Sequence, residues 1–158
     1  MVREAEPKDV SLIRALIGEL AAYEREPAAA VATEADLLRD GFGPRPRYQC
    51  LIAEHDGEPA GFALYFHNYS TWQGRSGLYL EDLFVRPEKR GAGAGRALLA
   101  ELARIAVREG CGRFEWMVLD WNTPAIGFYE KLGATPMKEW IKMRLLGDAL
   151  RALAAERP

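Results

Sequence analysis

The chain has 158 residues, of which 49% are hydrophobic and 28% charged, and its formal net charge is −2. This length fits one domain with a substantial apolar core, so we expect residues 1–158 to form a single domain. The small negative charge argues against nucleic acid as a partner. No apolar run approaches the length of a membrane span, and residues 1–5 lack the apolar run of a signal peptide. We therefore expect a cytoplasmic protein without a membrane partner.

The cysteines and histidines are too few and too scattered to predict a metal site. Cys50 and Cys111 belong to no C-x-x-C pair, and His55 and His67 cannot supply a three-histidine site. We expect no metal cofactor, and we expect both thiols to be buried on or beside strands.

The first half of the chain alternates between strand-like and helix-like patterns. The predicted elements, in chain order, are a strand at 2–5, a helix ending near 23, a short helix at 33–41, and strands at 48–54 and 59–68. Asp9 or Ser11 is suited to cap the first helix, and Thr33 followed by Asp36 resembles a capping pattern for the second. A tight turn at residues 55–58 makes the two strands a hairpin.

The second half continues with strands that are separated by helices. The predicted elements are a strand at 78–85, a helix ending at 110, a strand at 114–119, a helix at 122–133, a strand at 140–145 and a helix from about 148. Asn122 is suited to cap the helix at 122–133, and Gly133 to end it. Hairpin strands followed by strands alternating with helices indicate one mixed α/β domain.

The most informative stretch lies between the strand at 78–85 and the helix after it, and it reads Arg90, Gly91, Ala92, Gly93, Ala94 and Gly95. Glycine at alternate positions lets the backbone turn tightly and leaves room for a ligand. Free N–H groups at the helix start, with the helix dipole, favour a negative charge, so the run predicts a phosphate or pyrophosphate site. A mobile connection is the alternative, because the spacing matches neither a P-loop nor the dinucleotide fingerprint.

Acidic and aromatic side chains supply the candidate chemistry. Glu81 and Asp82 are neighbours in an otherwise apolar strand, and adjacent strand residues face opposite sides unless the strand bulges. Such acids favour a functional site, with an ion pair or a hydrogen bond to a nearby loop as the alternative. Tyr129 is a further candidate, for which ring packing is the alternative. Candidates in or beside the early loops, each alternatively a plain surface residue, are Tyr23, Glu24, Asp36 and Trp72.

Three motifs, in this order, resemble one family. They are the strand ending in Leu83-Phe84-Val85, the run Arg90-x-x-Gly93-x-Gly95, and Asn122-x-Pro124-Ala125-Ile126-x-Phe128-Tyr129-x-x-x-Gly133-Ala134. Together they resemble the Gcn5-related N-acetyltransferases, and residues 37–43, 79–85 and 121–122 look like the spermidine/spermine (diamine) acetyltransferase branch. The resemblance covers the chain from the first helix almost to the C-terminus. It implies a mixed, mostly antiparallel central sheet of about six or seven strands flanked by helices.

The resemblance also implies direct transfer of an acetyl group from acetyl-CoA to a primary amine in a ternary complex. The positions that it matches to the cofactor are Leu83, Phe84, Val85, Arg90, Gly91, Ala92, Gly93, Ala94, Gly95, Arg96, Asn122 and Tyr129. The strand residues would bind the pantetheine arm through their main chain, and one of their N–H groups would stabilise the developing oxyanion. Tyr129 matches the general acid that protonates the departing thiolate.

The acceptor amine sets further requirements. A primary amine has a pKa near 10.4 and is mostly protonated at neutral pH, so a base must take its proton, and Glu81 matches that position. Acids would attract and orient a cationic amine. The candidate substrate-binding residues are Tyr23, Glu24, Asp36, Trp72, Glu81 and Asp82. We expect the acceptor to be a polyamine, a diamine or a lysine-like amino acid, and the chain to form a homodimer.

Two departures from the branch lie near the acceptor side. The turn at 55–58 is tight where animal polyamine enzymes carry a longer insertion, and the loop between Trp72 and Glu81 is one residue longer. These departures leave the acceptor open, and the glycine run argues for binding rather than chemistry, so two alternatives to the predicted function stay open. The first is an acetyltransferase that acts on a protein or antibiotic amine, and the second is an acyl-CoA-binding sensor without turnover.

Overall fold

The computed structural model describes residues 1–156, and these form two compact units that divide after Leu119. The first unit holds a five-stranded sheet in the order β1-β2-β3-β4-β5. Its strands are β1 Val2–Glu4, β2 Gln49–His55, β3 Glu58–Ser70, β4 Arg75–Val85 and β5 Phe114–Trp116. Neighbouring strands from β1 to β4 are antiparallel, and β5 runs parallel to β4. The predicted mixed, mostly antiparallel α/β sheet is confirmed.

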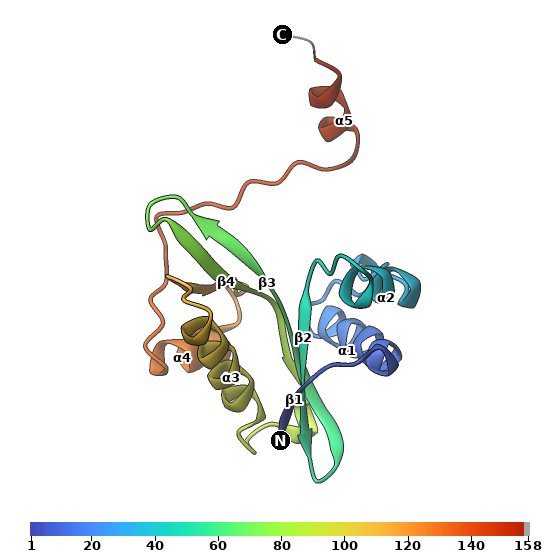
Figure 1. Ribbon diagram of the computed structural model, residues 1–158, viewed down its shortest axis with the longest axis vertical. Helices are drawn as coiled ribbons and strands as arrows, with labels where there is room; N and C mark the ends of the chain where they lie inside the picture. Colours follow the sequence, from blue (N-terminus) through green and yellow to red (C-terminus); the bar gives the residue numbers. More distant parts are fainter. Residues whose placement is uncertain (157–158) are drawn as a thin grey trace. The chain divides into compact units, whose positions relative to one another are not determined.

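Helices cover both faces of this sheet (Figure 1). α1 Val10–Tyr23 and α2 Glu34–Phe42 lie on one face, and α3 Ala94–Arg108 lies on the other. Three single-turn 3₁₀ helices occupy connections, namely η1 Pro7–Asp9, η2 Pro27–Ala29 and η3 Pro87–Lys89. None of the helices in the described part of the chain is long and apolar enough to cross a membrane.

The apolar periodicity of the sequence explains why these elements pack as they do. On the α1 and α2 face the buried cluster consists of Val10, Ile13, Leu16, Leu20, Leu37, Tyr48, Cys50, Ile52, Phe62, Leu64 and Phe84. On the other face, the buried residues of α3 are spaced three to four apart, as in Leu98, Leu102 and Ile105, and make one apolar stripe. Burying apolar area on both faces is the main contribution to the stability of the unit.

Polar contacts define the ends of the first two helices. Thr33 caps α2 as predicted, because its side chain accepts from the N–H of Asp36. Asp9 stands at the N-cap of α1, but its carboxylate makes no cap bond. It accepts instead from Arg3, at 2.7 and 2.9 Å, and from the N–H of Glu6 at 2.8 Å, and the Arg3 guanidinium is the main cause that lowers the pKa of Asp9 to about 2. The Asp9 position was therefore correctly predicted, but its contact was not.

The second unit begins at Asp120 and carries α4 Thr123–Lys131 and α5 Gly147–Ala155. The predicted strand at 140–145 is wrong for the described chain, since those residues form neither strand nor helix. A strand is defined by hydrogen bonds to a partner strand, and alternation of apolar residues cannot supply that partner. For the same reason the expected six or seven strands are five among residues 1–156.

Candidate active site

The second half of β4 has one free edge. β5 pairs with β4 only at Leu78, Tyr79 and Leu80, so within residues 1–156 no strand covers the same edge beyond Leu80. The N–H of Arg86 donates to Ala60 of β3, and hydrogen-bonded pairs alternate along an antiparallel ladder. The main-chain groups of Leu83 and Val85 therefore point away from β3, towards the free edge. An extended ligand with amide groups can add along this edge as a strand would.

Phe84 differs from its two neighbours in this respect. Its main-chain groups belong to the alternate position and face β3, and its side chain is buried in the core at 4% exposure. Of the three strand residues predicted to hold the cofactor, Leu83 and Val85 thus offer main-chain groups to a ligand. The side chain of Phe84 instead packs into the apolar core and anchors the strand there.

The glycine run forms the turn between η3 and α3. Gly91 and Gly93 have positive φ angles of 84° and 85°, which L side chains rarely adopt, and a Cβ at either would meet nothing within 4 Å. Gly93 is the N-cap of α3, and no side chain caps this helix start. The first N–H groups of α3 therefore face open space, where the helix dipole favours an anion. The geometry fits the predicted phosphate site.

A β-bulge brings the two predicted acids to one place. Leu64 pairs with Asp82 while Tyr65 pairs with Leu80, so Glu81 is an extra residue without a partner in the ladder. Leu64 and Tyr65 face opposite sides of β3, so Leu80 and Asp82 also face opposite sides of β4. Alternation does not assign the extra residue to either face, but the charge of Glu81 reaches Asp82 and contributes to the raised pKa of that carboxyl. The sequence did not decide whether the strand bulges here. Because it does, two adjacent acids can both contribute to one site.

Asp82 is the acid that this environment perturbs most. Partial burial, with smaller contributions from the negative charges of Glu81 and Glu24, raises its pKa from 3.8 to about 6. None of these causes is a hydrogen bond or a positive partner, which speaks against the structural alternative of an ion pair. Burial also raises the pKa of Glu24, which follows the last residue of α1. The charges of Glu81 and Glu24 thus both act on the Asp82 carboxyl.

A contact between Tyr23 and Arg90 links the end of α1 to the glycine run. The guanidinium carbon of Arg90 lies 4.7 Å from the centre of the Tyr23 ring, and the Tyr23 and Phe84 ring centres are 6.5 Å apart. The Arg90 Nε donates to the carbonyl of Val85 at 3.0 Å. The sequence did not predict the contact between Arg90 and Tyr23, which are 67 positions apart, and no spacing or motif could have indicated it. Arg96 lies in the first turn of α3 and is exposed.

Asp36 and Trp72 are placed differently from the other candidates. Both carboxylate oxygens of Asp36 are used within α2, by Thr33 and by Arg39, and these contacts lower its pKa to about 2. Trp72 is 89% exposed in the turn between β3 and β4. Arg75 precedes Glu81 by six positions, which places this turn roughly 20 Å from the bulge along the strand. Substrate contacts by Asp36 and Trp72 stay predictions.

Asn122 and Tyr129 belong to the second unit and are described within it. Asn122 is the N-cap of α4, where its Oδ1 accepts from the N–H of Ala125 at 3.4 Å, as predicted. Tyr129 lies in the last turns of α4, where its ring packs against that of Phe128 at 5.5 Å between centres. Their roles toward the cofactor stay predictions.

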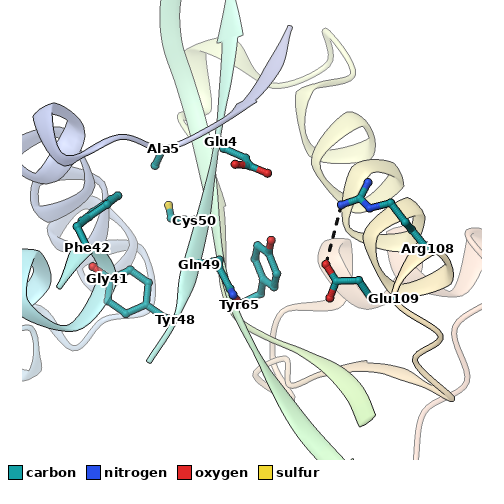
Figure 2. Close-up of a pocket in the computed structure, with 10 residues that line it drawn as sticks. All are labelled: Glu4, Ala5, Gly41, Phe42, Tyr48, Gln49, Cys50, Tyr65, Arg108 and Glu109. Atoms are coloured by element: carbon teal, nitrogen blue, oxygen red, sulfur yellow. Dashed lines mark ion pairs between the residues drawn. The ribbon is translucent and has the colours of Figure 1, made fainter. Parts of the chain in front are cut away.

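A separate cavity of about 340 Å³ lies beside the first residues of β2, near the end of β1 (Figure 2). Figure 2 shows Cys50 on one side of the strand and the ion pair of Arg108 with Glu109 on the other. None of the predicted site residues lines this cavity. Burial raises the pKa of Cys50 to about 12, so its thiol is protonated at neutral pH and carries no nucleophilic role. Cys50 is buried as expected, whereas Cys111 is only partly buried.

Comparison with known proteins agrees with this geometry. The model of the acetyltransferase (GNAT) family matches residues 14–134. A thialysine N-epsilon-acetyltransferase of Bos taurus is 42% identical, over 99% of this chain and 98% of that protein. A human spermidine/spermine N(1)-acetyltransferase-like protein is 38% identical, over 98% of this chain and 24% of that protein. Among solved structures, an integron cassette protein from the mobile metagenome of V. cholerae has a TM-score of 0.82 at 27% identity, over 99% of this chain and 98% of that one.

The branch suggested by the sequence is confirmed by these relatives, and so is the enzyme class. The family model covers most of the chain, including the whole of β4, the glycine run and α4. This chain belongs to the GNAT family and is an N-acetyltransferase.

Proposed function

We propose that this enzyme transfers an acetyl group from acetyl-CoA to the terminal primary amine of a small cationic molecule. The observation that carries the proposal is the continuity of the site along β4. A free main-chain edge at Leu83 and Val85 leads at one end to an uncapped helix start, and at the other end to a cluster of acids around the Glu81 bulge. One end suits an anion and the other a cation.

The features of this chain on the cofactor side of the site are suited to bind acetyl-CoA. The open space at Gly91 and Gly93 admits a pyrophosphate close to the backbone, and the free N–H groups of α3 would donate to it. The outward main-chain groups of Leu83 and the N–H of Val85 would pair with the amides of the pantetheine arm, whereas the Val85 carbonyl already accepts from Arg90. When bound, acetyl-CoA supplies the acetyl group as a thioester. An outward N–H of this edge would donate to the carbonyl oxygen as negative charge develops there.

The amine side is acidic, as a cationic acceptor requires. Asp82 and Glu24 would attract the cation and fix its orientation, and binding it would favour the ionised form of Asp82. Glu81 would accept the amine's proton, directly or through a water molecule. Its position at the bulge exposes it while keeping it next to Asp82. Tyr129 would donate the proton that the departing thiolate needs, and Asn122 would contact the cofactor near its sulfur.

The relatives narrow the acceptor to amines that end a short chain. The thialysine enzyme is named for the ε-amine of an amino acid, and the other relative is named for its likeness to an enzyme of spermidine and spermine. These acceptors share a terminal primary amine with a second cationic nitrogen a few bonds away. We propose this pattern, as found in lysine-like amino acids, diamines and polyamines, as the substrate class.

We also propose that the chain works as a homodimer. The support is the second unit, in which Trp140, Ile141 and Met143 are 66%, 83% and 86% exposed. Apolar side chains in such numbers on a surface mark an interaction site. Light scattering on the purified protein would test this proposal, since a monomer at micromolar concentration would contradict it.

A panel of amines read by release of the free CoA thiol tests the proposed function. We expect amine-dependent thiol release with lysine-like amino acids, diamines or polyamines. We expect little with a neutral amine, which the acids would not attract. Binding of acetyl-CoA without thiol release across the panel would indicate a sensor instead. Release with an aminoglycoside or a peptide amine alone would indicate the other alternative acceptor.

A further inference from the structure

The side chain of Arg90 connects the glycine run to two other elements of the first unit. Arg90 precedes Gly91, the first positive-φ glycine of the run. Its Nε donates to the carbonyl of Val85, and its guanidinium lies over the Tyr23 ring at 4.7 Å and near the Phe84 ring at 5.9 Å. Three elements thus meet at one group, namely the end of α1, the free edge of β4 and the loop before α3.

Two of the groups that Arg90 contacts belong to β4, and the third ends α1. Phe84 is 4% exposed in the core, and Val85 is held in register against Gly61 of β3. Tyr23 is the last residue of α1 and is 37% exposed, so its ring offers one face to the guanidinium. Planar stacking and an Nε donor are properties of arginine that lysine does not share.

We propose that Arg90 is a positioning residue that preorganises the glycine run for the cofactor through its stack on Tyr23, so that a residue on the amine side contributes to acetyl-CoA affinity. The inference rests on the proposed function. A run with two positive-φ glycines is entropically costly to order. Anchoring the residue before it reduces the cost that remains when the pyrophosphate binds.

The same contact links the two ends of the site. Tyr23 is followed directly by Glu24, one of the carboxylates that raise the pKa of Asp82. Losing the stack therefore frees both the loop that would hold the cofactor and the end of α1 that would face the amine. Losing a cation–π contact at a partly exposed site changes an equilibrium constant about two- to fivefold.

A double-mutant cycle on acetyl-CoA affinity tests the inference. Isothermal titration would measure the Kd of acetyl-CoA for the wild type, Tyr23→Leu, Arg90→Met and the double variant. We expect Tyr23→Leu to raise the Kd about two- to fivefold in the wild type and to have no effect in the Arg90→Met background. Tyr23→Phe keeps the ring and should bind as the wild type does. Thermal unfolding of each variant shows whether it is folded.

Arg96→Met is the matched control for charge. It removes a positive charge from the first turn of α3 but leaves the Tyr23 stack in place, so Tyr23→Leu should keep its full effect in that background. Equal effects of Tyr23→Leu in the wild-type and Arg90→Met backgrounds, or no effect in either, would overturn the inference while leaving the proposed function intact. Failure of the wild type to bind acetyl-CoA would overturn the proposed function itself, and the inference with it.

Discussion

Replacing Asp82 with asparagine should change how the stability of the protein depends on pH. The folded-state pKa of about 6 lies above the ordinary value of 3.8, because partial burial and the charges of Glu81 and Glu24 disfavour the ionised carboxylate. The native state therefore binds this proton more tightly than the unfolded state. Folding is favoured by protonated Asp82 at low pH, and stability is lost as pH rises from about 4 to above 6.

The size of the effect follows from the two pKa values. Between about pH 4.5 and pH 7.5, linkage gives a loss of roughly 2 kcal/mol from this one group. Solvent screening of a partly exposed carboxyl reduces this, so we expect about 1 kcal/mol. Asp82→Asn has no proton to lose and should escape the loss. Its advantage over the wild type should thus grow by about 1 kcal/mol across this pH range.

Urea unfolding of both proteins at the two pH values measures this difference directly. Glu81→Gln is the matched control, because it removes the neighbouring charge at an exposed position and leaves the burial of Asp82 in place. That variant should show a smaller pH-dependent loss than the wild type but not abolish it. A free-energy gap between wild type and Asp82→Asn that stays constant with pH would refute the assignment of a raised pKa to this residue.

Three further changes have defined outcomes. Gly93→Ala should lower the free energy of unfolding by about 1 kcal/mol, because it forces a side chain to a φ of 85° without any clash. It should also raise the Kd of acetyl-CoA, and an unchanged Kd would contradict the pyrophosphate assignment. Glu81→Gln should lower kcat about 10²- to 10⁴-fold, and a wild-type kcat would exclude Glu81 as the base. In the native protein a thiol reagent should modify Cys111 and spare Cys50, whose pKa of about 12 and burial protect it, and equal labelling of the two would contradict the packing around β2.

The parts that the sequence predicted well are those encoded by local patterns. A few neighbouring residues are enough to indicate the local structure in each case: the apolar spacing in α1 and α3, the capping pair at Thr33, and the glycine run. Backbone conformation at Gly91 and Gly93 is likewise a local matter, because only glycine adopts their φ angles freely. These elements could be predicted without knowing which other elements they pack against.

The parts that escaped prediction depend on pairing across the chain. The bulge at Glu81 exists only relative to the register of β3, and the Arg90 stack needs Tyr23 from the far end of α1. The predicted strand at 140–145 has the right alternation and fails for want of a partner strand within the described chain. Long-range register and tertiary contact override local pattern in each case.

The most direct test of the proposed mechanism is thiol release from acetyl-CoA in the presence of a diamine or a lysine-like amino acid, compared between the wild type and Tyr129→Phe. We expect the wild type to release CoA only when the amine is present, and Tyr129→Phe to bind acetyl-CoA but release the thiol far more slowly. Amine-independent release, or no release with any cationic amine, would contradict direct acetyl transfer at the β4 edge.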